Sequence, residues 1–186
     1  RDDINRFPVP TGWTPMRHET LPSGFEAVTF KNNTTGEIVI SFAGTNDPAD
    51  WATNFSLATG FNAQQLKEAA AYYLTVLTTV ANSNPNAWIT FTGHSLGGGL
   101  AALMSVFFDK GAVTFDQAPF ANAATTTVRD DLVAYLTTRG YASPQLNALA
   151  PGLATFTGLG QRAGNVSGFA IAGEILSLKI VEHLLG

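Results

Sequence analysis

The residue of this sequence whose surroundings best suit covalent chemistry is a serine placed between glycines. Residues 93–97 read Gly-His-Ser-Leu-Gly, after an apolar stretch typical of a buried strand (88–92) and before one typical of a helix (96–109). A serine on a tight turn between strand and helix presents its hydroxyl oxygen outside the fold, where it can attack a carbonyl carbon. This context predicts Ser95 as a nucleophile; the alternative is that Ser95 only caps the helix.

Three consecutive glycines, residues 97–99, stand at the start of the expected helix. Two of them, Gly97 and Gly98, each cost the helix about 1 kcal/mol relative to alanine, so we expect close backbone packing beneath the serine. Backbone N–H groups at this helix start are suited to hold a developing oxyanion. We expect His94 to pack or to orient the turn rather than to act as a base.

A serine nucleophile also needs a base and usually an acid that orients the base. Among the acids after Ser95 we favour Glu174, because it directly follows an expected strand; Asp116, at the end of another strand, is the alternative. A glutamate favoured at a helix N-terminus is the structural alternative for Glu174. Only His183 follows these acids, and in one helix the two side chains would be about 13 Å apart along the axis. Either the helix breaks, or His183 pairs with another acid, or the base lies beyond Gly186.

The rest of the chain alternates between strand-like and helix-like patterns. The expected strands are 25–30, 37–43, 88–92, 112–116 and 166–172, and the expected helices are 62–81, 96–109, 128–140 and 174–185. The first two strands read as a hairpin, and residues 1–24, with four prolines, as an extended arm. This order predicts a single domain over residues 1–186, with an α/β fold in which helices flank a mostly parallel central sheet.

Composition excludes several classes of function. Charged residues make up 13% of the chain, and the net charge of −4 with ten scattered Lys and Arg argues against nucleic-acid binding. Without cysteine there is no disulfide or thiolate nucleophile, and three separated histidines make a metal site unexpected. The apolar run 96–108 is too short to span a bilayer. The chain starts at Arg1 with no recognisable signal peptide, as expected of a mature product or an excised domain.

Two stretches resemble the class 3 (triacylglycerol) lipase family, which has the α/β-hydrolase fold. They are "ITFTGHSLGGGLAAL" and, upstream, "IVISFAGTNDPADWATNF", with "AVTFDQAPF" as a weaker third match to the family's T-F-G-x-P strand. The resemblance implies that the oxyanion hole is formed by Thr45 and by Leu96, the residue after the nucleophile. It also implies that Asp50, Trp51 and Asn54 anchor the loop that carries Thr45. Ala43 departs from the family's arginine, and Gly99 from a common alanine.

The resemblance and the serine turn together predict a secreted carboxylic ester hydrolase acting on lipid or other apolar acyl esters through an acyl-enzyme. No metal or organic cofactor is expected, and neither is a transmembrane segment. The expected partners are an apolar ester or lipid substrate and, transiently, a lipid interface. Thirteen phenylalanines and the Gly/Pro/Ala-rich stretch 141–164 are candidates for an acyl site and a mobile cover, or simply for core and surface loop. A non-catalytic lipase-like module, an acyltransferase and a peptidase remain as alternatives.

Overall fold

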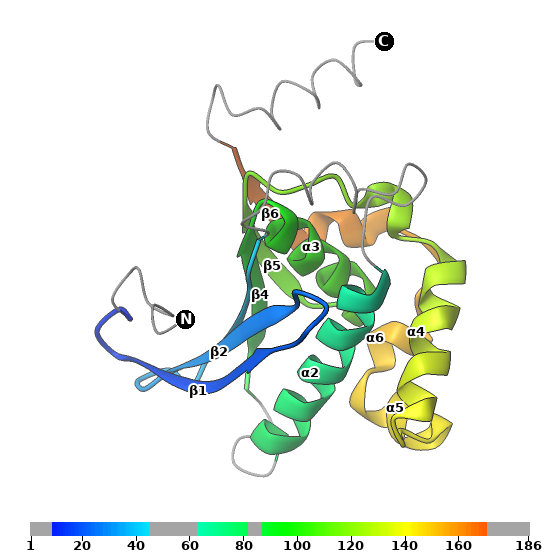
Figure 1. Cartoon of the computed structure of the whole chain (residues 1–186), viewed down its shortest axis with the longest axis horizontal. Helices are drawn as coiled ribbons and strands as arrows, with labels where there is room; N and C mark the ends of the chain where they lie inside the picture. The colour runs from blue at the N-terminus through cyan, green and yellow to red at the C-terminus, as the bar shows by residue number, and fades with distance from the viewer. Residues whose placement is uncertain (1–8, 45–62, 82–86, 171–186) are drawn as a thin grey trace.

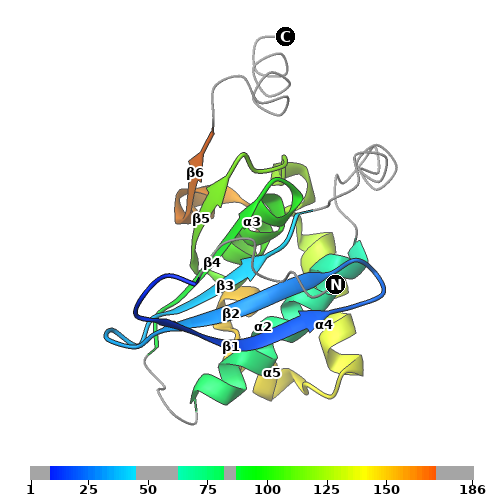
Figure 2. The same ribbon diagram turned by 60° about the vertical axis from the view of Figure 1, so that its left-hand side comes forward.

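The computed structural model describes residues 9–44, 63–81 and 87–170, and within them six strands form one sheet in the order β1-β2-β3-β4-β5-β6. The strands are β1 (Trp13–Thr20), β2 (Glu26–Asn32), β3 (Ile38–Phe42), β4 (Ile89–His94), β5 (Gly111–Phe115) and β6 (Val166–Phe169). β1, β2 and β3 pair antiparallel, whereas β3, β4, β5 and β6 pair parallel. The expected α/β fold with a mostly parallel sheet is confirmed, as is the hairpin of β2 and β3 (Figures 1 and 2).

The helices within the described residues lie on one side of this sheet (Figure 1). They are α2 (Ala63–Ala81), α3 (Leu96–Phe108), α4 (Thr126–Thr138), α5 (Ser143–Leu149) and α6 (Pro151–Ala154), with 3-10 turns η1 (Ala121–Ala123) and η2 (Gly160–Asn165). Connections between parallel strands are almost always right-handed. Because β3 to β6 follow one another in chain order across the sheet, each connection carries its helix to the same face. None of these helices is long and apolar enough to cross a membrane.

The core lies between the sheet and α2 and α3. Every residue of α3 after Leu96 is buried, in keeping with its continuous apolar sequence. Alternate residues of β3 and β4 face this helix, and Phe42 of β3 stacks on Phe91 of β4 at 5.9 Å between ring centroids. Tyr73 of α2 joins the cluster with its ring 5.2 Å from that of Phe91. This packing fixes α3, and therefore the serine at its start, against the middle of the sheet.

The opposite face of the sheet carries side chains that remain partly exposed. Val28, Val39, Thr92 and Val113, one from each of four neighbouring strands, are half-buried there. Near the carboxyl ends of β5 and β6 the exposure increases, to 46% for Phe115 and 59% for Phe169. Parallel strands are normally covered on both faces, so this surface is unusual for its strand type.

The extended arm expected for residues 1–24 is wrong for residues 13–20, which form the edge strand β1. Trp13 pairs with Asn32 and Thr20 with Glu26 of β2. Most side chains of β1 are exposed, so the strand lacks the alternation of apolar and polar residues that reveals a half-buried strand. Pro15, which argues against a central strand, is tolerated at the sheet edge beside a register shift between Pro15 and Arg17.

Candidate active site

Ser95 occupies the turn between β4, which ends at His94, and α3, which begins at Leu96. Its backbone has φ 54° and ψ −123°, a strained conformation that non-glycine residues rarely adopt and that costs about 1–3 kcal/mol. Its side chain makes no capping hydrogen bond to the helix. The helix-cap alternative therefore loses its support, because a capping serine would accept a hydrogen bond from the first turn.

The glycines on either side of Ser95 bring backbone segments into direct contact. A Cβ atom on Gly93 would lie 2.4 Å from the carbonyl carbon and oxygen of Gly97. A Cβ atom on Gly97 would lie 2.3 Å from the carbonyl oxygen of Phe42, at the end of β3. No side chain fits at either position, and for Gly97 this explains a residue of poor helix propensity in the first turn of α3.

A second turn, residues 115–118 after β5, forms backbone hydrogen bonds with Ser95. The Ser95 N–H donates to the carbonyl oxygen of Phe115 at 3.0 Å, and the Ala118 N–H donates to the carbonyl oxygen of Ser95 at 2.9 Å. The Cα and Cβ atoms of Gln117 would lie 3.1 Å from a Cβ on Gly98, so the turn also abuts the first turn of α3. Sequence patterns alone did not reveal this support, because it depends on the pairing of β4 with β5.

A backbone N–H group suited to hold an oxyanion directly follows Ser95. The Leu96 N–H belongs to the first turn of α3, where amide groups have no intrahelical acceptor and where the helix dipole favours negative charge. Gly44 brings the chain that leaves β3 next to the serine, since a Cβ on Gly44 would lie 3.6 Å from Cβ of Ser95. Thr45, which follows Gly44, lies outside the described residues and stays a prediction, as do the loop anchors Asp50, Trp51 and Asn54.

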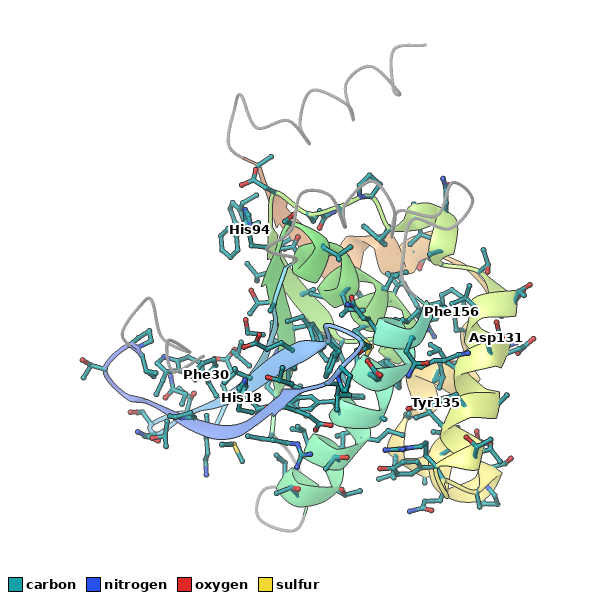
Figure 3. The ribbon with its side chains drawn as sticks, viewed as in Figure 1. His18, Phe30, His94, Asp131, Tyr135 and Phe156 are labelled. Atoms are coloured by element: carbon teal, nitrogen blue, oxygen red, sulfur yellow. The ribbon has the colours of Figure 1, made fainter. Side chains whose placement is uncertain are left out.

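Of the acids and histidines named for the site, the structure describes Asp116 and His94. Glu174 and His183 lie outside the described residues, together with the expected closing helix, so their roles stay predictions. Asp116 follows β5 and is buried, with its Oδ2 atom 3.8 Å from Nε2 of His94. The His94 side chain is 66% exposed at the carboxyl end of β4 (Figure 3). Among the described residues, no group of three His, Asp or Glu side chains could hold a metal ion.

Aromatic side chains form a row across the sheet next to the serine turn. His94, Phe115 and Phe169 are register partners on β4, β5 and β6, and the two phenylalanine rings stack at 5.8 Å with an interplanar angle of 23°. Register partners on neighbouring strands project from the same face. The sequence indicated β5 and β6 as strands, but only their register brings this exposed apolar pair beside His94.

The stretch 141–164 is not placed as a mobile cover over Ser95. It forms α5, α6 and η2, and a Cβ on Gly152 of α6 would lie 2.4 Å from the carbonyl group of Phe108. Arg162 of η2 donates to the carbonyl oxygen of Val106 at 2.9 Å. Both contacts are at the C-terminal end of α3, whereas Ser95 precedes its N-terminal end. A helix of this length separates the two by about 20 Å.

The sequence matches a known protein family over most of its length. The sequence model of the Tle-like phospholipase domain, a phospholipase-like family, matches residues 9–182. The chain belongs to the Tle-like phospholipase domain family. The match covers every described strand and helix and the segment in which Glu174 lies. The expectation of a lipase family, based on the stretches around Ser95 and around residues 38–55, is thereby confirmed.

Two curated relatives are similar to part of this chain. An extracellular phospholipase A1 from Serratia liquefaciens is 38% identical over 107 residues, which are 58% of this chain and 31% of that protein. A secreted mono- and diacylglycerol lipase from Fusarium solani is 29% identical over a 107-position alignment that covers 50% of this chain and 32% of that protein. The chain thus matches about a third of the length of these relatives.

A solved structure extends the comparison to the fold of the Tle-like domain. The lipase from Rhizopus microsporus var. chinensis superposes with a TM-score of 0.51 at 14% sequence identity, over 67% of this chain and 50% of that one. At this identity the likeness concerns the fold alone, and it confirms the α/β-hydrolase fold expected from the sequence.

Proposed function

We propose that this domain hydrolyses carboxylic esters of lipids with Ser95 as the nucleophile. The observation that carries the proposal is the strained backbone of Ser95 on a strand–helix turn, with its hydroxyl not used as a helix cap. Strain of this kind persists only where the surrounding structure imposes it, and it is concentrated at functional sites. Membership of a phospholipase-like family supports the same reaction class.

In the proposed reaction, the Ser95 hydroxyl oxygen attacks the ester carbonyl carbon while a histidine base takes its proton. The base is His183 or a histidine beyond Gly186, and Glu174 or Asp116 orients it. The oxyanion that develops on the carbonyl oxygen is held by the backbone N–H groups of Thr45 and Leu96. When the tetrahedral intermediate collapses, the alcohol leaves with the proton, and the acyl group stays on Ser95 as an ester. Water, deprotonated by the same histidine, then releases the carboxylic acid.

The proposed substrate is a phospholipid or another lipid ester with an apolar acyl chain. Similarity to a phospholipase A1 and to a mono- and diacylglycerol lipase supports a lipid ester as the substrate. The exposed pair of Phe115 and Phe169 beside the serine turn supports it as well, because an acyl chain bound at Ser95 would find apolar surface there. Since both relatives are described as extracellular or secreted, we further propose that this protein acts outside the cytoplasm.

The proposal is tested by measuring hydrolysis of p-nitrophenyl esters from butyrate to palmitate and of phosphatidylcholine vesicles. Wild type, Ser95→Ala and the matched control Ser143→Ala are compared; Ser143 is exposed at the start of α5, remote from the serine turn. We expect Ser95→Ala to lose at least about 10³-fold in kcat and Ser143→Ala to keep full activity. A folded wild-type protein that hydrolyses none of these esters, or a fully active Ser95→Ala, would refute the proposal; the former outcome favours a binding module.

A further inference from the structure

Asp116 is a buried residue in a left-handed backbone conformation. Its φ angle is 42°, in the left-handed region, and only 5% of the residue is exposed. Aspartate enters this region more readily than most residues, yet glycine does so at lower cost. Burial of a carboxylate is also costly unless partners compensate for lost hydration. The aspartate side chain at this position therefore needs an explanation.

The carboxylate of Asp116 lies against the residue that precedes the nucleophile. Its Oδ2 atom is 3.8 Å from Nε2 of His94, too far for a direct hydrogen bond but close enough for the carboxylate to attract the imidazole when that ring is protonated. The His94 side chain is mostly exposed, whereas that of Asp116 is 3% exposed. The buried carboxylate is therefore the fixed partner, and the imidazole is the group whose position it restricts.

Asp116 belongs to the turn 115–118, whose backbone is hydrogen-bonded to Ser95. The Asp116 N–H donates to the carbonyl oxygen of Phe169 at 2.8 Å, which fastens this turn to β6. The residue before it, Phe115, accepts from the Ser95 N–H, and Ala118 donates to the Ser95 carbonyl. A displacement at position 116 is thus transmitted to Ser95 through His94 and through the turn.

We propose that Asp116 is a positioning residue for the nucleophile: its carboxylate restrains His94, and with it the end of β4, so that the Ser95 hydroxyl keeps its reactive orientation. The inference rests on the proposed function. It differs from the role of a triad acid, which would hold the histidine that takes the proton from Ser95. The aspartate occupies this left-handed position although glycine would relieve the backbone there.

The test combines Asp116→Asn, which removes the charge but keeps the shape, with Asp116→Gly, which also relieves the backbone. Asp130→Asn is the matched control, because that carboxylate is exposed on α4 and pairs with Arg129. The readouts are kcat and KM for a soluble ester, the rate at which a fluorophosphonate probe labels Ser95, the free energy of unfolding, and the ¹⁵N signals of the His94 ring.

We expect kcat and the labelling rate to fall roughly 10-fold in both Asp116 variants, with KM unchanged, because displacement of a reacting group by a fraction of an ångström reduces rate rather than binding. Asp116→Gly should be at least as stable as wild type. In a His94→Gln background, Asp116→Asn should cause no further loss, since the carboxylate acts through that ring.

Four results would overturn the inference. Unchanged kcat and labelling in both variants would make Asp116 merely structural, and a loss on the order of 10⁴-fold would make it the triad acid. Full additivity with His94→Gln would show that it does not act through His94. If the wild type lacks Ser95-dependent activity, the proposed function fails. The ¹⁵N signals of the His94 ring test the contact independently of activity. If Asp116→Asn leaves these signals unchanged, the contact between Asp116 and His94 is refuted.

Discussion

Replacing Gly97 by alanine is the substitution for which the structure allows the most specific prediction. The added methyl carbon would lie 2.3 Å from the carbonyl oxygen of Phe42 and 2.7 Å from the carbonyl carbon of Ala43. Real Cβ atoms essentially never approach other heavy atoms within 3.0 Å, so α3 and the end of β3 must separate by at least about 0.7 Å. The obstacle is backbone on both sides, and no side-chain rotation relieves it.

The expected cost follows from two opposing contributions. Overpacking a core costs about 1–3 kcal/mol, and here we expect the upper end because the displaced group is a strand of the central sheet. Alanine favours the helix by about 1 kcal/mol relative to glycine, which offsets part of this cost. The net loss in the free energy of unfolding is therefore about 2 kcal/mol. Because the displaced segment leads into Gly44, beside Ser95, we expect kcat to fall on the order of 10²-fold.

Urea unfolding followed by tryptophan fluorescence measures the first quantity, and turnover of p-nitrophenyl butyrate measures the second. The matched control is Gly111→Ala at the start of β5, where an added Cβ would meet no atom within 4 Å. With a typical urea dependence of about 2 kcal/mol per M, the midpoint should drop by about 1 M for Gly97→Ala and should not drop for the control. Equal stability and activity in the two variants would refute the argument that Gly97 is required by backbone contact.

Two further predictions concern stability. Burial raises the pKa of Tyr73. Above pH 10 the Tyr73 hydroxyl is therefore ionised in the unfolded chain but still protonated in the folded protein. The free energy of unfolding then falls by up to about 1.4 kcal/mol per pH unit. Tyr73→Phe should flatten this fall in urea unfolding at pH 8, 10 and 11; an identical slope in both proteins would contradict it. Arg162 donates at 2.9 Å to the carbonyl oxygens of Val106 and Gly152, so Arg162→Ala should lower the free energy of unfolding by about 3 kcal/mol. Arg139 is exposed on the surface beside Tyr135, and Arg139→Ala should leave the free energy of unfolding nearly unchanged. Equal melting temperatures of the two arginine variants would show that these carbonyls find other donors.

The parts of the fold that depend on neighbouring residues in sequence were predictable. The apolar stretches around Ser95 predicted a strand and a helix, and the structure has β4 ending at His94 and α3 beginning at Leu96. The helix expected at 62–81 is observed as α2. Such segments reveal themselves because hydrophobic periodicity and turn residues act over a few positions.

The strand β1 could not be predicted, because its stability comes from a partner rather than from its own pattern. Its side chains are mostly exposed, and it contains Pro15. Residues 13–20 become a strand because β2 offers hydrogen bonds along its edge and Tyr72 of α2 donates to the carbonyl oxygen of Arg17. The short helices of 141–164 were missed for a related reason, since α5 and α6 are stabilised by a few buried side chains, such as Leu146 and Leu153.

By itself, the sequence determined that a serine stands on a strand–turn–helix segment, flanked by glycines that leave room for backbone contact. The tertiary structure alone decided what surrounds it. Gly97 touches β3, Asp116 reaches His94, and Phe169 stacks on Phe115, although these pairs come from segments far apart in the chain or on different strands. Which strands are neighbours, and in what register, follows from the crossover connections and the packing of the whole sheet, and a local pattern carries no information about either.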